Sequence, residues 1–284
     1  MLRYIDTHGL RLAALPIGEQ RAGEPIILLH GVTHSVYFWQ PDPFYTELGP
    51  CWALSLPGHF PASTPLSLHC PLTAESVIDP LAAAIEQLSD RPVTLIGVST
   101  GGFAALALAA RYPQLVRRVI SISGFARGRW IGSFGMLQAA ARRGTLGEAL
   151  FRSTAGMAGR NDLALRMFIA TAGPGWSYGP IARYPYLDAV LTAMRPVLAK
   201  LDAEAMLAYF AAMPEIDIGP LLPTIAAPTL LIAGGRDPIV PTAESRRAAA
   251  AIPNATLKIF PAAGHLPNFE HYPEFCQLVR AWLR

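Results

Sequence analysis

Short apolar segments alternate with helical patterns along most of the chain. Six segments have strand length, are mainly apolar or β-branched, and stop at or shortly before a glycine or proline: 26–29, 52–54, 93–96, 119–122, 229–232 and 256–260. Helical stripes or alanine-rich helix formers occupy four further stretches, at 73–88, 103–111, 243–251 and 275–283. This alternation predicts an α/β fold, a mostly parallel sheet with helices on both faces. Residues 4–17, with His8-Gly9 at their centre, favour an antiparallel hairpin at the edge of the sheet.

The stretch 125–220 breaks this alternation. It contains no clear strand pattern, and helices are expected over 134–143, 163–171, 187–200 and 203–213. Nine arginines and one lysine stand against seven acidic residues there, so the stretch carries a charge of +3, whereas the remainder of the chain is balanced. We therefore expect a core made of 1–124 and 221–284, with 125–220 inserted between two strands as a helical cap.

The composition excludes several classes of protein. Of the 284 residues, 52% are hydrophobic and only 15% are charged, which excludes an intrinsically disordered chain. A net charge of +3 without any dense Lys/Arg cluster argues against nucleic-acid binding. Residues 92–110 are uncharged over a membrane-spanning length, but glycines and a serine lie at their centre, so they favour a buried strand, a turn and a helix, and no membrane span is expected.

The cysteines and the N-terminus indicate the compartment. Cys51, Cys70 and Cys276 are odd in number and widely spaced, so neither a disulfide framework nor a zinc site is expected. Free thiols fit a reducing compartment, and the first residues lack the apolar stretch of a signal peptide. We expect a cytoplasmic protein. No motif for a cofactor or a metal is visible, and the sequence leaves open whether the chain forms a homodimer.

The sharpest motif is Gly97-Val98-Ser99-Thr100-Gly101, a G-x-S-x-G. It follows a strand-like run and opens a helical one, which is the setting that a nucleophile elbow requires. A tight strand-to-helix turn strains the serine backbone, and glycines on both sides avoid collisions with the strand and the helix. The pattern predicts Ser99 as a nucleophile, with a plain glycine-rich turn as the alternative.

A serine hydroxyl needs a base, and the base needs an orienting acid. Asp237 follows the run 229–232, and His265 follows the run 256–260. Side chains beyond the carboxyl ends of parallel strands meet at one edge of the sheet. We therefore expect a Ser99–His265–Asp237 triad. Two alternatives remain, since Asp237 could merely cap the helix after it and His265 could be an ordinary loop histidine.

The chain must turn with its amides exposed after His30-Gly31. The backbone N–H groups of Val32 and Thr100 are then the expected pair of oxyanion donors. A plain turn is the alternative for His30-Gly31.

Together these motifs resemble the α/β-hydrolase fold family, in its group of capped esterases and lipases. The motifs that carry the resemblance are His30-Gly31, the run 97–102, Gly235-Arg236-Asp237 and Gly264-His265. The resemblance implies a sheet of about eight strands with a helical cap. One loop departs from the family, because Ser55-Leu56-Pro57-Gly58-His59-Phe60 stands where members usually carry Asp-x-Pro-Gly-His-Gly.

The resemblance implies an enzyme that hydrolyses a carboxylic ester or lactone through an acyl-enzyme. A catalytic serine argues against dehalogenase or epoxide hydrolase chemistry, in which relatives attack with aspartate. Hydrolysis of a C–C bond in a diketone, acyl transfer to an alcohol or thiol, and ligand sensing with little turnover remain alternatives. The cap is expected to form an apolar pocket for a small or medium ester. The candidate substrate-binding residues are His34, Phe103, Trp130 and Phe134. For His34, a place on the loop surface without substrate contact is the default alternative.

Arg127 and Arg129 lie near the start of the cap. They either bind a carboxylate or phosphate on the substrate or form a solvated or ion-paired hinge, which is the default expectation.

Overall fold

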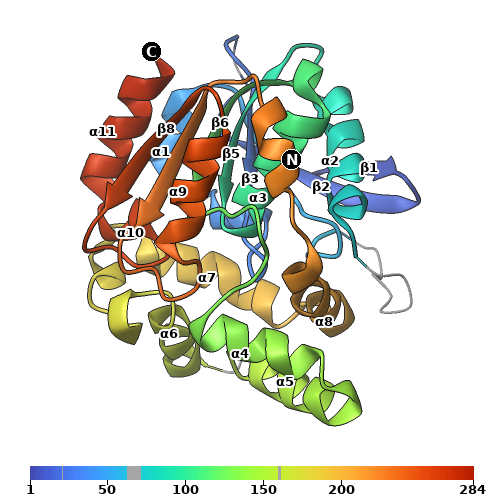
Figure 1. Ribbon diagram of the computed structural model, residues 1–284, viewed down its shortest axis with the longest axis vertical. Helices are drawn as coiled ribbons and strands as arrows, with labels where there is room; N and C mark the ends of the chain where they lie inside the picture. Colours follow the sequence, from blue (N-terminus) through green and yellow to red (C-terminus); the bar gives the residue numbers. More distant parts are fainter. Residues whose placement is uncertain (21, 63–71, 159–160) are drawn as a thin grey trace.

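The architecture is a single eight-stranded sheet between layers of helices (Figure 1). The computed structural model describes residues 1–20, 22–62, 72–158 and 161–284. The strands lie in the order β1-β2-β4-β3-β5-β6-β7-β8. Their bounds are β1 Arg3–Thr7, β2 Leu10–Ile17, β3 Ile26–Leu29, β4 Cys51–Leu54, β5 Val93–Val98, β6 Val116–Ile122, β7 Thr229–Gly234 and β8 Ala255–Phe260. All pairs from β4 to β8 are parallel, whereas β1 and β2 form an antiparallel hairpin at one edge.

The central strands are apolar at nearly every position because both faces of the sheet are covered. Every residue of β3, β5 and β7 is buried, which is typical of parallel strands under helices on both sides. On one face, α1 (Pro43–Leu48) packs against α11 (Tyr272–Leu283), with the rings of Phe44 and Phe275 5.8 Å apart. On the other face, α2 (Ala74–Leu88) packs against α3 (Thr100–Arg111), and α9 (Thr242–Ala251) packs on β7 and β8.

The helical segment leaves the sheet after β6 and returns at β7, the neighbouring strand (Figure 1). It contains α4 Gly132–Ala141, α5 Gly144–Ala158, α6 Asp162–Ala170, α7 Leu187–Leu198 and α8 Ala203–Ala212. Its outgoing and returning ends lie side by side, since Arg127 and Asp217 form a β-bridge and an ion pair of 2.8 Å. Figure 1 shows these helices gathered below the sheet. The division into a core and a cap stays a prediction.

The structure confirms the predicted α/β sheet of eight mostly parallel strands with an antiparallel edge hairpin. Three α-helices were not predicted: α1, α5 and α10, which spans only Pro267–Glu270. Helix α1 is only six residues long, and α5 contains several glycines, which lower its helix propensity.

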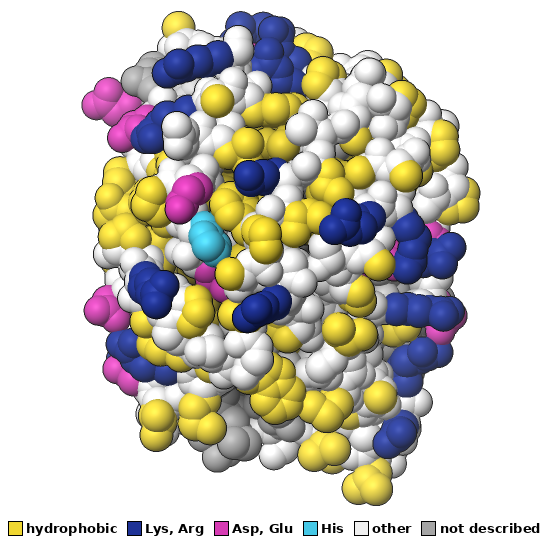
Figure 2. All heavy atoms as spheres, turned by 60° about the vertical axis from the view of Figure 1, so that its left-hand side comes forward, with side chains coloured by type: hydrophobic (Ala, Val, Ile, Leu, Met, Phe, Trp, Pro, Cys, Tyr) yellow, Lys and Arg dark blue, Asp and Glu magenta, His cyan; other side chains and the backbone are white. Residues whose placement is uncertain are grey.

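Some sequence features can be placed only in part. Cys51 and Cys276 are buried, and the Cys51 thiol donates to the Tyr45 carbonyl, whereas Cys70 lies outside the described residues. Within the described ranges, no helix is long and apolar enough to span a membrane, and no group of side chains could hold a metal ion. Figure 2 shows one face of the molecule, on which Lys and Arg side chains are scattered among hydrophobic ones.

Candidate active site

Ser99 stands on the sharp turn between β5 and α3. Its backbone has φ 54° and ψ −117°, a region that costs a non-glycine residue about 1–3 kcal/mol. Two hydrogen bonds hold it there, because Ser99 N–H donates to the Ile122 carbonyl at 2.8 Å and Phe103 N–H donates to the Ser99 carbonyl at 3.0 Å. The strained turn lifts the serine above the carboxyl end of the sheet.

The flanking glycines are required by space rather than by torsion angles. A Cβ atom at Gly97 would stand 2.2 Å from the Gly101 carbonyl oxygen, and one at Gly101 would stand 2.1 Å from the Leu29 carbonyl oxygen. Real Cβ atoms do not approach backbone oxygen so closely, so any side chain would force the turn or β3 to move. The motif therefore packs the turn directly against the end of β3.

Asp237 and His265 meet beyond the ends of β7 and β8. His265 Nδ1 lies 2.8 Å from Asp237 Oδ2, and the two side chains are only 7% and 3% exposed. The other carboxylate oxygen, Oδ1, accepts the N–H groups of Ile239 and Val240 at 2.8 and 2.9 Å. Asp237 thus caps the following turn as well as contacting the histidine, and the capping bonds fix the direction of its second oxygen.

Glu270 is a residue that the sequence analysis missed. It belongs to no recognisable sequence motif. Its buried carboxylate accepts the Gly264 N–H, at 3.0 Å to Oε1 and 2.9 Å to Oε2, and the Leu266 N–H at 3.2 Å. These residues flank His265 on both sides. Burial raises the pKa of Glu270, and the hydrogen bonds from Gly264 and Leu266 oppose that rise. The carboxylate holds the loop that presents the imidazole.

Ser99 and His265 line one cavity, together with Val32, His34 and Phe134. Phe168 and Ile169 of α6 and the segment after it close this cavity from the helical side. Ser99 is 7% exposed and is one of the residues that line this cavity. The structure brings together five of the predicted site residues at this point, with Asp237 behind His265.

The two predicted oxyanion donors lie next to this cavity. Over the residues that the structure describes, neither the Val32 N–H nor the Thr100 N–H donates to a protein acceptor. A hydrogen bond to His59 holds the Val32 carbonyl in place, with His59 Nε2 2.5 Å from the carbonyl oxygen. Burial lowers the pKa of His59 to about 4, so its ring is neutral near pH 7.

His30 fixes the start of the same loop. Leu56 N–H donates to His30 Nε2 at 3.1 Å, which leaves Nδ1–H to donate to the Gly31 carbonyl at 2.8 Å. Burial lowers the pKa of His30 well below its usual value. The loops after β3 and β4 are thereby joined through two buried neutral histidines, His30 and His59.

Two of the predicted substrate-binding residues lie elsewhere. Phe103 is fully buried on α3 and stacks on Phe125 with ring centroids 5.4 Å apart, and Trp130 packs edge-on against Phe125 and Phe210. Neither ring lines the cavity that holds Ser99, because both fill the packing between the sheet and the helical segment. Of the predicted set, only His34 and Phe134 reach it.

Arg127 and Arg129 are tied to the returning end of the helical segment. Arg127 pairs with Asp217, and Arg129 Nε donates to the Pro214 carbonyl at 3.3 Å. This arrangement fits the expected ion-paired hinge.

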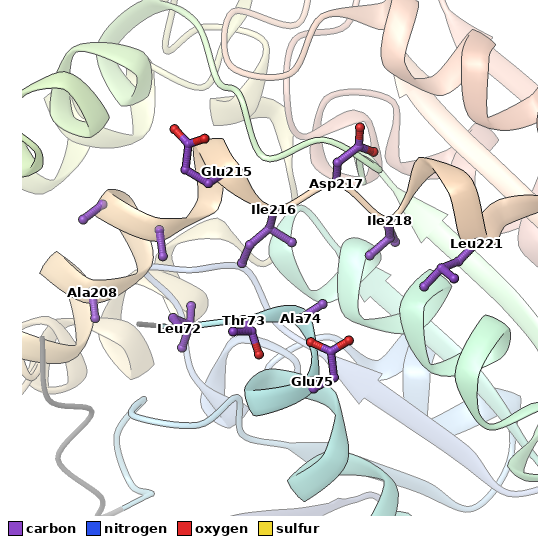
Figure 3. A pocket seen from close by; sticks show the side chains of 12 residues that line it. Leu72, Thr73, Ala74, Glu75, Ala208, Glu215, Ile216, Asp217, Ile218 and Leu221 are labelled. Atoms are coloured by element: carbon purple, nitrogen blue, oxygen red, sulfur yellow. The ribbon is translucent and has the colours of Figure 1, made fainter. Parts of the chain in front are cut away.

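A second hollow, a groove between the start of α2 and the segment that follows α8, lies apart from these residues (Figure 3). Its lining includes Glu75, Ile216 and Ile218. In Figure 3 the two isoleucine side chains point toward α2, whereas the carboxylates of Glu215 and Asp217 point away from it. Neither Ser99 nor His265 lines it, so it is not the candidate active site.

Comparison with known proteins agrees with the fold and gives the family. Residues 24–272 match the family described as alpha/beta hydrolase fold, and the chain belongs to that family. A pimeloyl-(acyl-carrier protein) methyl ester esterase of Neisseria meningitidis is 28% identical over 263 residues, which cover 91% of this chain and 93% of that protein. A protein of the same name from Xanthomonas campestris is 29% identical over 282 residues, covering 92% and 95%.

Solved structures show the same architecture. The enol-lactonase of Burkholderia xenovorans matches with a TM-score of 0.78 at 23% identity, over 99% of both chains. At this identity the likeness establishes the fold and leaves the substrate open.

Proposed function

We propose that this α/β-hydrolase cleaves a carboxylic ester or lactone with Ser99 as nucleophile, His265 as general base and Asp237 as the acid that orients the base. The observation that carries the proposal is the buried contact of 2.8 Å between His265 Nδ1 and Asp237 Oδ2. His265 lines the same cavity as Ser99, whose backbone is strained. Relatives named as methyl ester esterases support ester cleavage.

The reaction proceeds in two steps. His265 takes the Ser99 proton while Oγ attacks the ester carbonyl, and the Val32 and Thr100 N–H groups stabilise the oxyanion. His265 then gives the proton to the departing alcohol oxygen, which leaves an acyl group on Ser99. Water attacks this acyl-enzyme with His265 again as base, and the carboxylic acid is released. Hydrogen bonds between nucleophile and base commonly tighten only when substrate binds.

The cavity indicates an uncharged, apolar acyl group. A second cavity adjoins the first and shares Phe168, Ile169 and Leu266 with it. It extends between α6 and α7, where Val190, Leu191 and Met194 are among its lining residues. Apart from the two histidines of the site, the described lining of both cavities carries no ionisable side chain. We expect an uncharged acyl chain there, because burying a charge in such surroundings would be costly, and we propose that it is of small or medium length.

The test is hydrolysis of p-nitrophenyl esters from acetate to palmitate by the wild-type protein and the Ser99→Ala variant. We expect turnover with an optimum at one chain length, and loss of at least about 10³-fold in kcat in the variant. A folded Ser99→Ala protein that retains substantial turnover would contradict the nucleophile. A wild-type protein that cleaves none of the esters but cleaves a diketone would contradict ester hydrolysis and support C–C bond hydrolysis instead.

A further inference from the structure

His34 lies in the turn after β3, beside the serine. Its N–H donates to the Gly31 carbonyl at 3.0 Å, and its ring stacks on Phe38 with centroids 4.5 Å apart and planes 22° from parallel. A Cβ atom at Gly31 would stand 3.0 Å from His34 Nδ1 and 3.4 Å from Ser99 Cβ. The imidazole and the nucleophile therefore flank the same glycine.

The ring also stands where the two cavities join. His34 lines the cavity that contains Ser99 and the apolar cavity between α6 and α7. An acyl chain that runs from Ser99 into the second cavity passes the residues that both cavities share, and His34 is one of them. The other residues shared by both cavities are Thr33, Phe168, Ile169 and Leu266, so the imidazole brings the only ring nitrogens to this neck among the described residues.

One nitrogen of the imidazole lacks a protein partner. Nδ1 is buried and has no hydrogen bond to any described residue. A buried polar atom without a partner is unfavourable, and a ligand that forms a hydrogen bond with it removes that penalty. Burial, with the nearby His265 as a smaller cause, lowers the pKa of His34 to about 3. The ring is therefore neutral at neutral pH and offers one N–H donor.

We propose that His34 is a specificity-determining residue that donates a hydrogen bond to an uncharged oxygen on the acyl chain, close to the ester carbonyl. The preferred substrates are then 3-oxoacyl or 3-hydroxyacyl esters rather than plain acyl esters. A carboxylate at that point of the acyl chain is disfavoured, because burying its charge is costly and the described lining has no cationic side chain to pair with it. The inference rests on the proposed ester hydrolysis at Ser99.

The test compares two esters that share alcohol and chain length, ethyl 3-oxohexanoate and ethyl hexanoate. The quantity measured is the ratio of their kcat/KM values in the wild type, His34→Phe and His34→Gln. Phenylalanine keeps the stack on Phe38 and removes the donor, whereas glutamine retains an N–H. We expect the ratio to fall about fivefold in His34→Phe, as the loss of one neutral hydrogen bond implies, and to recover in part in His34→Gln. The matched control is His271→Phe, a histidine outside both cavities, which should keep the wild-type ratio.

The ratio separates this role from others. Equal losses on both esters in His34→Phe would mean that the ring acts on the ester group itself or on the fold, and would overturn the inference. Binding to Ser99→Ala, in which His34 is intact, gives an independent measure: the 3-oxo ester should bind several-fold tighter than the plain ester, and equal affinities would overturn the inference. A wild type that hydrolyses neither ester, or a Ser99→Ala protein that hydrolyses both, would instead contradict the proposed function.

Discussion

The carboxylate of Glu270 accepts the backbone N–H of Gly264 at 2.9 and 3.0 Å, one residue before His265. Because this bond and the one from Leu266 fix the loop on both sides of the imidazole, Glu270→Ala should misplace the base by a fraction of an ångström to an ångström. We expect kcat to fall up to about 10²-fold with little change in KM. Steady-state kinetics on one p-nitrophenyl ester give kcat and KM separately and so test this expectation.

Two further variants test that interpretation. Glu270→Gln keeps one acceptor oxygen and should lose less activity than Glu270→Ala. Glu274→Ala, an exposed glutamate on α11, should behave like the wild type. A Glu270→Ala protein with wild-type kcat would show that the loop holds His265 without the carboxylate.

Gly101 should not tolerate even a methyl group. The Cβ atom of Gly101→Ala would stand 2.1 Å from the Leu29 carbonyl oxygen, so the turn must separate from β3. We expect the free energy of unfolding to fall by at least about 3 kcal/mol, measured by urea denaturation. Gly179→Ala is the matched control, since its nearest neighbour would be the Ser177 hydroxyl at 3.7 Å. Similar stabilities of the two variants would contradict the packing argument.

Stability should decrease as the solution becomes acidic. His59 is buried and neutral, with its pKa lowered from 6.5 to about 4, whereas in the unfolded chain it titrates near 6.5. The unfolded state therefore binds the extra proton first, so the contribution of His59 is present above pH 6.5 and is lost as the pH falls from 6.5 toward 4. The slope is about 1.4 kcal/mol per pH unit for one group.

The variant His59→Gln isolates this contribution. It should be less stable than the wild type at pH 7.5, because the bond to the Val32 carbonyl is weakened, but its stability should depend less steeply on pH between 6.5 and 4.5. Denaturation curves at several pH values give both slopes. Parallel pH dependences would mean that His59 does not titrate on unfolding.

Much of the sheet and three site residues could be predicted because they obey local rules. Apolar strands, the glycines of the turn at Ser99, and the loops that carry Asp237 and His265 leave local patterns, and parallel strands bring such loops to one edge. Glu270 leaves no such pattern, since its partners are backbone N–H groups that only the folded loop presents.

The candidate substrate-binding residues are harder to predict. Phe103, Trp130 and Phe134 are equally apolar in sequence, and only packing decides that Phe134 reaches the cavity. The glycine-containing helix α5 has weak local propensity and depends on its contacts with α4 and α8.

The cavity between α6 and α7 should set the acyl chain length. Leu191 is 6% exposed and lines only this cavity. Leu191→Trp fills it, so we expect the optimum of the p-nitrophenyl ester series to move to shorter chains, with acetate hydrolysis least affected. Met167→Trp, at an exposed position of α6, serves as the control and should keep the wild-type optimum. An unchanged optimum in Leu191→Trp would place the acyl chain elsewhere.

The central claim, that Ser99 is a nucleophile activated by His265, is tested most directly by covalent labelling. A fluorophosphonate loses fluoride when a serine oxygen attacks its phosphorus, and mass spectrometry locates the adduct. We predict one adduct per chain, on the peptide that contains Ser99, formed much more slowly in His265→Ala and absent in Ser99→Ala. Labelling at another residue, or equal labelling of Ser99→Ala, would contradict the account.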